Sequence, residues 1–127
     1  MSDVQKGRKR VGCVEAILHT FGYRTMISSR SGQRLAQRAQ SLAIDGDLLA
    51  IAPQDSNLPH LIAEIGGPGK RIDSSIAEMV AEGLPAGVIP IVVKQTASRP
   101  ERRWRWSLSS DEGYDTLEEL LDAVRER

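Results

Sequence analysis

Two carboxylates stand where the apolar pattern of the sequence predicts buried strands. Asp47 opens the apolar segment that ends at Ala52, and Glu64 lies near the end of the next one, residues 61–65. A buried carboxylate is rare without a partner, so each acid needs one. If the two strands are neighbours, the carboxylates converge, and their oxygens suit Mg²⁺ or Mn²⁺. Spacing alone leaves the alternative that both acids are solvated at strand ends.

The elements that would position these acids follow from the periodicity of the apolar residues. The pattern predicts, in order, a basic tail (1–10), a helix (10–22), strands (24–28, 47–52, 61–65), a helix from residue 72 capped by Asp73, strands (88–94, 103–108) and an acidic C-terminal helix opened by Asp115 within residues 111–127. Residues 29–45 lack a period and predict a long loop. The order favours a single α/β domain, residues 1–127, with a mixed sheet of about five strands flanked by helices.

Strict alternation in residues 103–108 predicts which side chains of that strand face the core. Trp104 and Trp106 would point inward, whereas Arg103 and Arg105 would point to solvent. The apolar residues of this strand and of the helix near residue 72 could instead contribute to a homodimer interface.

The composition is that of a soluble globular protein, with 127 residues of which 40% are hydrophobic and 27% are charged. No apolar run approaches the ~20 residues that span a bilayer, and no apolar segment of a secretory signal follows the polar N-terminus. We therefore expect a cytoplasmic protein without a membrane partner, of cellular or viral origin. The lone Cys13 cannot form an internal disulfide and is predicted to be an inert core thiol.

The formal net charge is zero, but its distribution favours a polyanionic partner. Residues 1–110 hold 15 of the 17 Lys and Arg and 10 of the 17 acids, whereas residues 111–127 hold 2 cations and 7 acids. An acidic C-terminus of net charge −5 therefore masks a basic body of net charge +5. The basic residues form three groups that would hold DNA phosphates: Lys6, Arg8, Lys9 and Arg10; Arg30, Arg34 and Arg38; and Arg99, Arg102, Arg103 and Arg105. The alternative for each group is a solvated face.

Two other chemistries are excluded by spacing. The segment Gly66-Gly-Pro-Gly-Lys70 is not a phosphate-binding P-loop, because Glu64 stands where that loop begins with Gly and Arg71 stands where it requires Ser or Thr. His19 and His60 are too few and too far apart for a zinc site without cysteine ligands.

The segment Asp45-Gly-Asp47-Leu-Leu-Ala-Ile51, with Glu64 seventeen residues after Asp47, resembles the core of the PD-(D/E)xK, or restriction-endonuclease-like, nucleases. Over roughly residues 6–108, the order of the surrounding motifs is similar to the archaeal-type Holliday-junction resolvase branch. These motifs are a basic start, a first helix bearing an acid, a Ser/Gly-rich loop, a second helix, the strand that ends at Lys94 and the Trp-Arg-Trp strand. The resemblance implies a restriction-endonuclease-like fold.

The resemblance also implies roles for single residues. The ligands that it implies for Mg²⁺ or Mn²⁺ are Asp47, Glu64, the carbonyl oxygen of Ile65 and, through water, Glu15. The alternative for Glu15 is a solvated helix residue. Ser29, or Ser31, would contact the scissile phosphate, with plain solvation as the alternative.

One departure from the family concerns its lysine, which follows the glutamate by two residues and is here Gly66. That lysine would orient the attacking water and stabilise charge on the phosphate. We expect Lys70 to replace it, because the glycine-rich turn lets the backbone fold back and return the side chain toward the carboxylates. Lys94 is the second choice, and its alternative is a solvated residue at a strand end.

The residues and the resemblance together predict a metal-dependent, structure-selective endodeoxyribonuclease that cuts Holliday junctions in DNA recombination or repair. A homodimer is expected, because a junction is cut in two symmetry-related strands and one such domain has one predicted site. The alternatives are a nuclease of the same fold that acts on flap, nicked or foreign DNA, and a DNA-binding module that does not cut.

Overall fold

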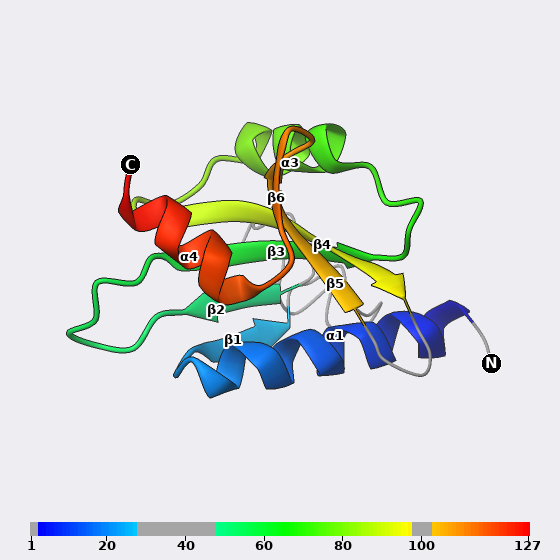
Figure 1. Ribbon diagram of the computed structural model, residues 1–127, viewed down its shortest axis with the longest axis horizontal. Coiled ribbons are helices and arrows are strands. Elements are labelled where there is room, and N and C mark those ends of the chain that lie inside the picture. Colours follow the sequence, from blue (N-terminus) through cyan, green and yellow to red (C-terminus); the bar gives the residue numbers. More distant parts are fainter. Residues whose placement is uncertain (1–2, 28–47, 98–102) are drawn as a thin grey trace.

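The computed structural model describes residues 3–27, 48–97 and 103–127, with the backbone alone for residues 3–8. Its elements are α1 (Asp3–Thr20), β1 (Arg24–Ile27), β2 (Leu48–Ile51), β3 (His60–Gly66), α3 (Ile72–Ala81), β4 (Val88–Ala97), β5 (Arg103–Ser109), β6 (Glu112–Tyr114) and α4 (Leu117–Arg125). The strands form one six-stranded sheet in the order β1-β2-β3-β4-β5-β6, with helices packed on it (Figure 1). The predicted α/β class and mixed sheet are confirmed, and β6 is the strand that the sequence did not predict.

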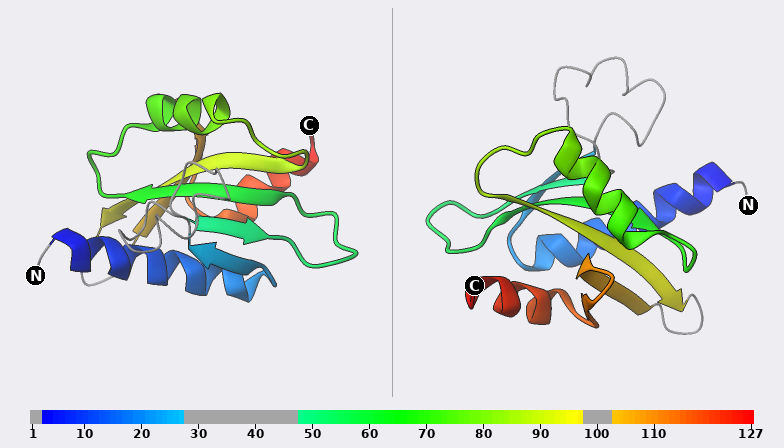
Figure 2. Two further views of the ribbon diagram at one scale, coloured as in Figure 1. Left: turned by 180° about the vertical axis from the view of Figure 1, so that it is seen from behind. Right: turned by 90° about the horizontal axis from the view of Figure 1, so that it is seen from above.

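The sheet is mixed because one neighbouring pair of strands is parallel. β3 and β4 run parallel, and the pairs β1–β2, β2–β3, β4–β5 and β5–β6 are antiparallel. A parallel pair needs a crossover connection, and α3 supplies it. Figure 2 shows α1 and α3 on opposite sides of the sheet. The carboxyl ends of β3 and β4 therefore meet at one edge of the sheet, between two helical layers.

Two hydrophobic cores fill the two faces of the sheet. The main core joins α1, α4 and one face of the strands, and its buried residues include Leu18, Ala63, Val93, Trp106 and Leu120. The smaller core lies under α3, where Ile62, Met79 and Val92 are fully buried. Since neighbouring residues of a strand point to opposite faces, Ala63 and Ile65 face α1 while Ile62 and Glu64 face α3.

The tryptophan strand is oriented as its alternation predicted. Trp104 and Trp106 are 8% and 2% exposed, whereas Arg103 and Arg105 are exposed. Both tryptophans belong to the main core, so the prediction that this strand contributes apolar surface to a dimer is wrong. Cys13 is partly buried and packs against the same core, as expected.

Three helix starts differ from the sequence predictions. α1 begins at Asp3, so the basic tail is wrong for residues 3–10, which apart from Gly7 are tolerant of helix. Asp73 does not cap α3, whose N-cap is Arg71. The carboxylate of Asp73 instead accepts hydrogen bonds from the amide and hydroxyl of Ser110 at 2.8 and 2.5 Å. α4 is capped by Thr116, one residue after the predicted Asp115.

Within the described segments, no helix combines the length and the apolar character needed to cross a membrane.

Candidate functional site

Glu64 and Lys70 form an ion pair at the carboxyl edge of β3. The ammonium Nζ of Lys70 donates to Glu64 Oε1 at 2.5 Å. The side chain of Lys70 is 27% exposed and that of Glu64 is 14% exposed, so the pair is largely withdrawn from solvent. Glu64 shares its sheet face with Ile62, and this places the pair beside the smaller core under α3. The pair is therefore less screened by water than an ion pair on the open surface.

The turn after β3 carries Lys70 back over the strand. The amide of Lys70 donates to the carbonyl of Gly67 at 3.0 Å, and this bond closes the turn. A Cβ atom on Gly66 would lie 2.9 Å from both Cβ and Cδ of Lys70, so the lysine stem occupies the space of a side chain at position 66. A lysine at position 66 would compete with Lys70 for this space. The contact between Lys70 and Glu64 is the one that the glycine-rich turn predicted.

The second carboxylate oxygen of Glu64 has no partner among the residues that the structure describes. Oε2 is buried and accepts no hydrogen bond there. Leaving a buried acceptor unpaired costs about 1–3 kcal/mol, so native proteins seldom do it without a bound ion, water or ligand. A buried carboxylate oxygen is also the ligand type that hard divalent cations prefer. Glu64 therefore fits a Mg²⁺ or Mn²⁺ ion bound through Oε2.

Asp47, the other predicted ligand, lies outside the described residues, as do Ser29, Ser31, Arg30, Arg34 and Arg38. Leu48, which follows Asp47 in the chain, pairs with Ala63. Ala63 precedes Glu64 in the chain. The paired residues Leu48 and Ala63 are therefore the chain neighbours of Asp47 and Glu64, respectively. Among described residues, no three His, Cys, Asp or Glu side chains gather as a metal site.

Glu15 is engaged elsewhere. Its Oε2 accepts a hydrogen bond from Thr25 Oγ1 at 2.5 Å, and His19 Nε2 lies 2.9 Å from the same hydroxyl. Because the single hydroxyl proton goes to Glu15, His19 donates to the hydroxyl oxygen. This cluster lies on the α1 side of the sheet, and Glu64 faces the α3 side. Glu15 therefore does not share a sheet face with Glu64, which argues against its predicted role as a ligand of the same ion.

Two other predicted residues lie close to Glu64 in the strand register. Lys94 of β4 pairs with Gly66, and because Glu64 pairs with Val92, Lys94 is on the same face as Glu64. Ile65, whose carbonyl was a predicted ligand, pairs with Val93. Lys94 is half-buried. It is therefore a second lysine at the carboxyl ends of β3 and β4, beside the Glu64–Lys70 pair in the strand register.

The predicted DNA-binding cations are placed by α1 and β5. Lys9 is exposed, and the side chains of Lys6 and Arg8 are outside the described set. Arg105 pairs with Asp115 at 2.9 Å in an exposed position, so part of its charge is already balanced. Arg10 is partly buried, and its Nε donates to Gln95 Oε1 at 3.0 Å. Gln95 was not predicted, because nothing in the sequence pairs a strand glutamine with an arginine eighty-five residues away.

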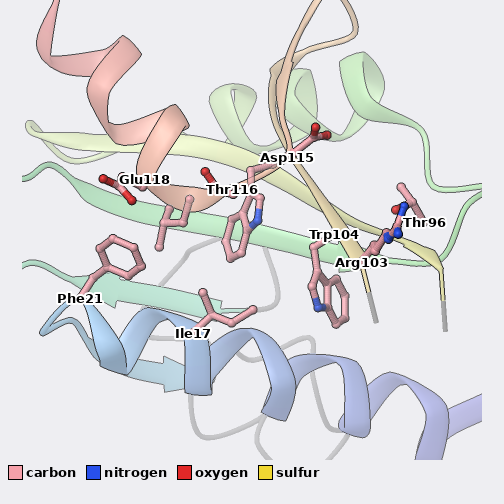
Figure 3. A pocket seen from close by; sticks show the side chains of 10 residues that line it. Ile17, Phe21, Thr96, Arg103, Trp104, Asp115, Thr116 and Glu118 are labelled. Atoms are coloured by element: carbon pink, nitrogen blue, oxygen red, sulfur yellow. The ribbon is translucent and has the colours of Figure 1, made fainter. Parts of the chain in front are cut away.

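A cavity of about 700 Å³ lies between α1, β5 and α4, on the face opposite Glu64 (Figure 3). Ile17, Phe21 and Trp104 form its apolar wall, and Asp115 and Glu118 contribute carboxylates. These carboxylates repel phosphate groups. Arg103, a predicted DNA-binding residue, also lines the cavity, but the two carboxylates offset its charge. The Glu64 site is therefore the better candidate.

No protein family model matches this chain, and neither the curated proteins nor the solved structures contain a significant match to it.

Proposed function

We propose that this protein is a metal-dependent endodeoxyribonuclease whose site is built on Glu64, Lys70 and Asp47. The observation that carries the proposal is the buried, unpartnered Oε2 of Glu64 beside the ammonium group of Lys70. A carboxylate with one oxygen free for a cation, next to a lysine, is suited to hydrolysis of a phosphodiester. The resemblance to PD-(D/E)xK nucleases and the restriction-endonuclease-like fold that it implies support this reading.

Each residue has a distinct task in this proposal. Glu64 binds Mg²⁺ or Mn²⁺ through Oε2, and Asp47, which precedes the Ala63 partner Leu48, supplies a second carboxylate. The bound ion would lower the pKa of a coordinated water and polarise the phosphate. Lys70 holds Glu64 Oε1 in the unbound protein and, when DNA is bound, stabilises the charge that develops on the phosphate oxygens. Water adds to phosphorus as the bond to one ester oxygen breaks.

Four-way DNA junctions are the proposed substrate, with a homodimer as the working unit. The basic body of the chain and the absence of a predicted base-reading element favour recognition of DNA shape and backbone over sequence. A twofold dimer presents two sites in fixed opposition, as paired cleavage of a junction requires. Flap, nicked or foreign DNA remain the alternative substrates of the same chemistry.

A DNA-binding module without nuclease activity is a second candidate. The observation that favours it is the Lys70–Glu64 contact itself, because an ammonium group 2.5 Å from Oε1 already neutralises the carboxylate. In that case Lys70 would stabilise the fold and no ion would bind.

One experiment separates these candidates. Labelled four-way, flap and linear DNA are incubated with the protein in Mg²⁺ and in chelator. We expect cleavage in Mg²⁺ only, with the four-way junction cut fastest and in paired, opposed strands. Binding of all three without cleavage in either condition would overturn the nuclease proposal and leave the DNA-binding module.

A further inference from the structure

We propose that Arg10 is a phosphate-binding residue at the carboxyl edge of β3 and β4, and that Gln95 and Gly67 position its guanidinium group. The inference rests on the proposed DNA substrate and adds a defined contact to it. It concerns the α1 side of the edge, where Lys70 and Glu64 do not lie.

The guanidinium group of Arg10 is held from one side. Its Nε donates to Gln95 Oε1 at 3.0 Å, and Gln95 is itself fixed in the sheet by its pairing with Trp104. Arg10 is partly buried, and across the described ranges no further hydrogen bond or ion pair of Arg10 is found. Among the described residues, the two terminal amino groups, which carry four N–H donors, have no partner, and the proposal assigns them to a ligand.

Gly67 sets the place of the guanidinium group. A Cβ atom on Gly67 would lie 3.0 Å from Nη2 of Arg10, so the group lies against the backbone of the turn. In the same way, the missing side chain of the preceding Gly66 leaves space for the stem of Lys70. Two consecutive glycines thus let two cations approach one turn, Lys70 toward the α3 side and Arg10 on the α1 side.

The geometry fits a phosphate group. A planar guanidinium fork binds phosphate through two parallel hydrogen bonds, and a fork already fixed at Nε loses less side-chain entropy on binding. Because Glu64 lies just before the same turn, a DNA phosphate on Arg10 would be a near neighbour of the scissile phosphate. The inference therefore names a backbone contact that holds DNA next to the site.

The test measures DNA affinity in chelator, so that it does not depend on cleavage. A labelled four-way junction is titrated at several salt concentrations with wild type, Arg10→Gln and Gln95→Glu. Loss of one phosphate contact should weaken binding about tenfold or more and reduce the slope of log K against log salt by about 1. Gln95→Glu should give the same change, because its carboxylate neutralises Arg10, while the thermal midpoint stays equal or rises. A merely structural Gln95 would leave the salt slope unchanged.

Arg24→Gln is the matched control, since Arg24 is an exposed cation on β1 at the end of the sheet where β3 begins. It should bind as wild type. Inorganic phosphate as a competitor tests whether the site recognises the phosphate group itself. In that case, millimolar phosphate should weaken the binding of DNA to wild type but should leave the binding of DNA to Arg10→Gln unchanged. Wild-type affinity and slope in Arg10→Gln would overturn the inference, even if the protein cuts DNA. Conversely, a protein that never cuts DNA but shows the slope change retains this site and loses the nuclease proposal.

Discussion

Lys70 and Gly66 are in direct contact, because a Cβ atom on Gly66 would lie 2.9 Å from Cβ and Cδ of Lys70. The lysine stem thus replaces a side chain that position 66 does not have. The contact directs the ammonium group to Glu64 Oε1 at 2.5 Å. Gly66 therefore serves the site through the space that it leaves open, and its backbone has no special φ angle.

Replacement of Gly66 by alanine should disturb this contact. The added methyl group would meet Cβ of Lys70, which cannot move without the backbone, so we expect a loss of about 1–3 kcal/mol of unfolding free energy in urea denaturation. Gly69→Ala is the control, because a Cβ there meets nothing within 4 Å.

The origin of that loss can be isolated by a double-mutant cycle. In a Lys70→Gly background, which removes Cβ, Cγ and Cδ of the stem, Gly66→Ala should cost clearly less than in wild type. Equal costs in both backgrounds would show that the lysine stem is not what fills the space at Gly66.

Removal of the ammonium group should make the fold responsive to divalent cations. Lys70→Met leaves the carboxylate of Glu64 without its cation, and the expected loss is about 1–3 kcal/mol, between the values for exposed and buried ion pairs. Mn²⁺ or Mg²⁺ should then raise the thermal midpoint of this variant more than that of wild type, because the ion replaces the lost charge. Differential scanning fluorimetry with and without chelator checks this.

Lys94→Met is the matched control for this measurement, since Lys94 is a second lysine on the same face of the sheet. It should lose less stability and show no added response to the ion. The reverse ranking would transfer the role from Lys70 to Lys94. If Mg²⁺ and Mn²⁺ leave the thermal midpoint unchanged in every variant, the result would argue against a metal at Glu64.

Much of the fold follows from local patterns in the sequence. The alternation around Trp104 and Trp106 and the apolar stripe of Leu117, Leu120 and Leu121 each predict the correct element and buried face. The helix starts are less predictable, because Asp115 and Thr116 are both good capping residues at the start of α4, and because a tertiary contact engages Asp73 near the start of α3. Asp73 bonds to Ser110, thirty-seven residues away, and this contact has no local signal.

The site was predictable only where a single short segment builds it. The conformation of the turn from Gly66 to Lys70 depends on residues within the turn, so the return of the lysine to Glu64 could be predicted from sequence. The face on which Glu15 lies depends on how α1 packs across the sheet, and its bond with Thr25 was therefore not foreseen. The Arg10–Gln95 hydrogen bond joins α1 to β4. It also depends on how α1 packs across the sheet, so it was not predicted either.

The proposed dimer can be tested by its mass. Light scattering at micromolar concentration should report about twice the 13.9 kDa of the chain. Met26, Ile27 and Val80 are the exposed large hydrophobic residues of the described segments, and the proposed interface would use them, since both tryptophans are buried. Val80→Glu should reduce the mass if α3 contributes. A monomer that nicks linear duplex as readily as junctions would eliminate junction resolution and leave the nuclease proposal standing.

Tyr23 should make the protein lose stability at alkaline pH. Burial raises the pKa of Tyr23 to about 12, against a smaller lowering by Arg125, and its hydroxyl donates to the carbonyl of Pro59 at 2.8 Å. The unfolded chain releases this proton near its ordinary pKa of 10.0, so the stabilisation is complete below pH 10 and is lost as the pH rises toward 12. Urea denaturation of wild type and Tyr23→Phe between these values checks it. The phenylalanine variant should have the flatter profile, and equal slopes would contradict the role of Tyr23.

The central claim is that Glu64 binds the ion that activates phosphodiester hydrolysis. Its most direct test is the cleavage rate of a labelled four-way junction by Glu64→Gln and wild type in Mg²⁺, at protein concentrations that saturate the DNA. The amide keeps the size of the side chain but removes the charge that the ion needs, so cleavage should fall by about 100-fold or more while the affinity for DNA in chelator stays within a few-fold of wild type. Cleavage by Glu64→Gln at a rate near that of wild type would contradict the account.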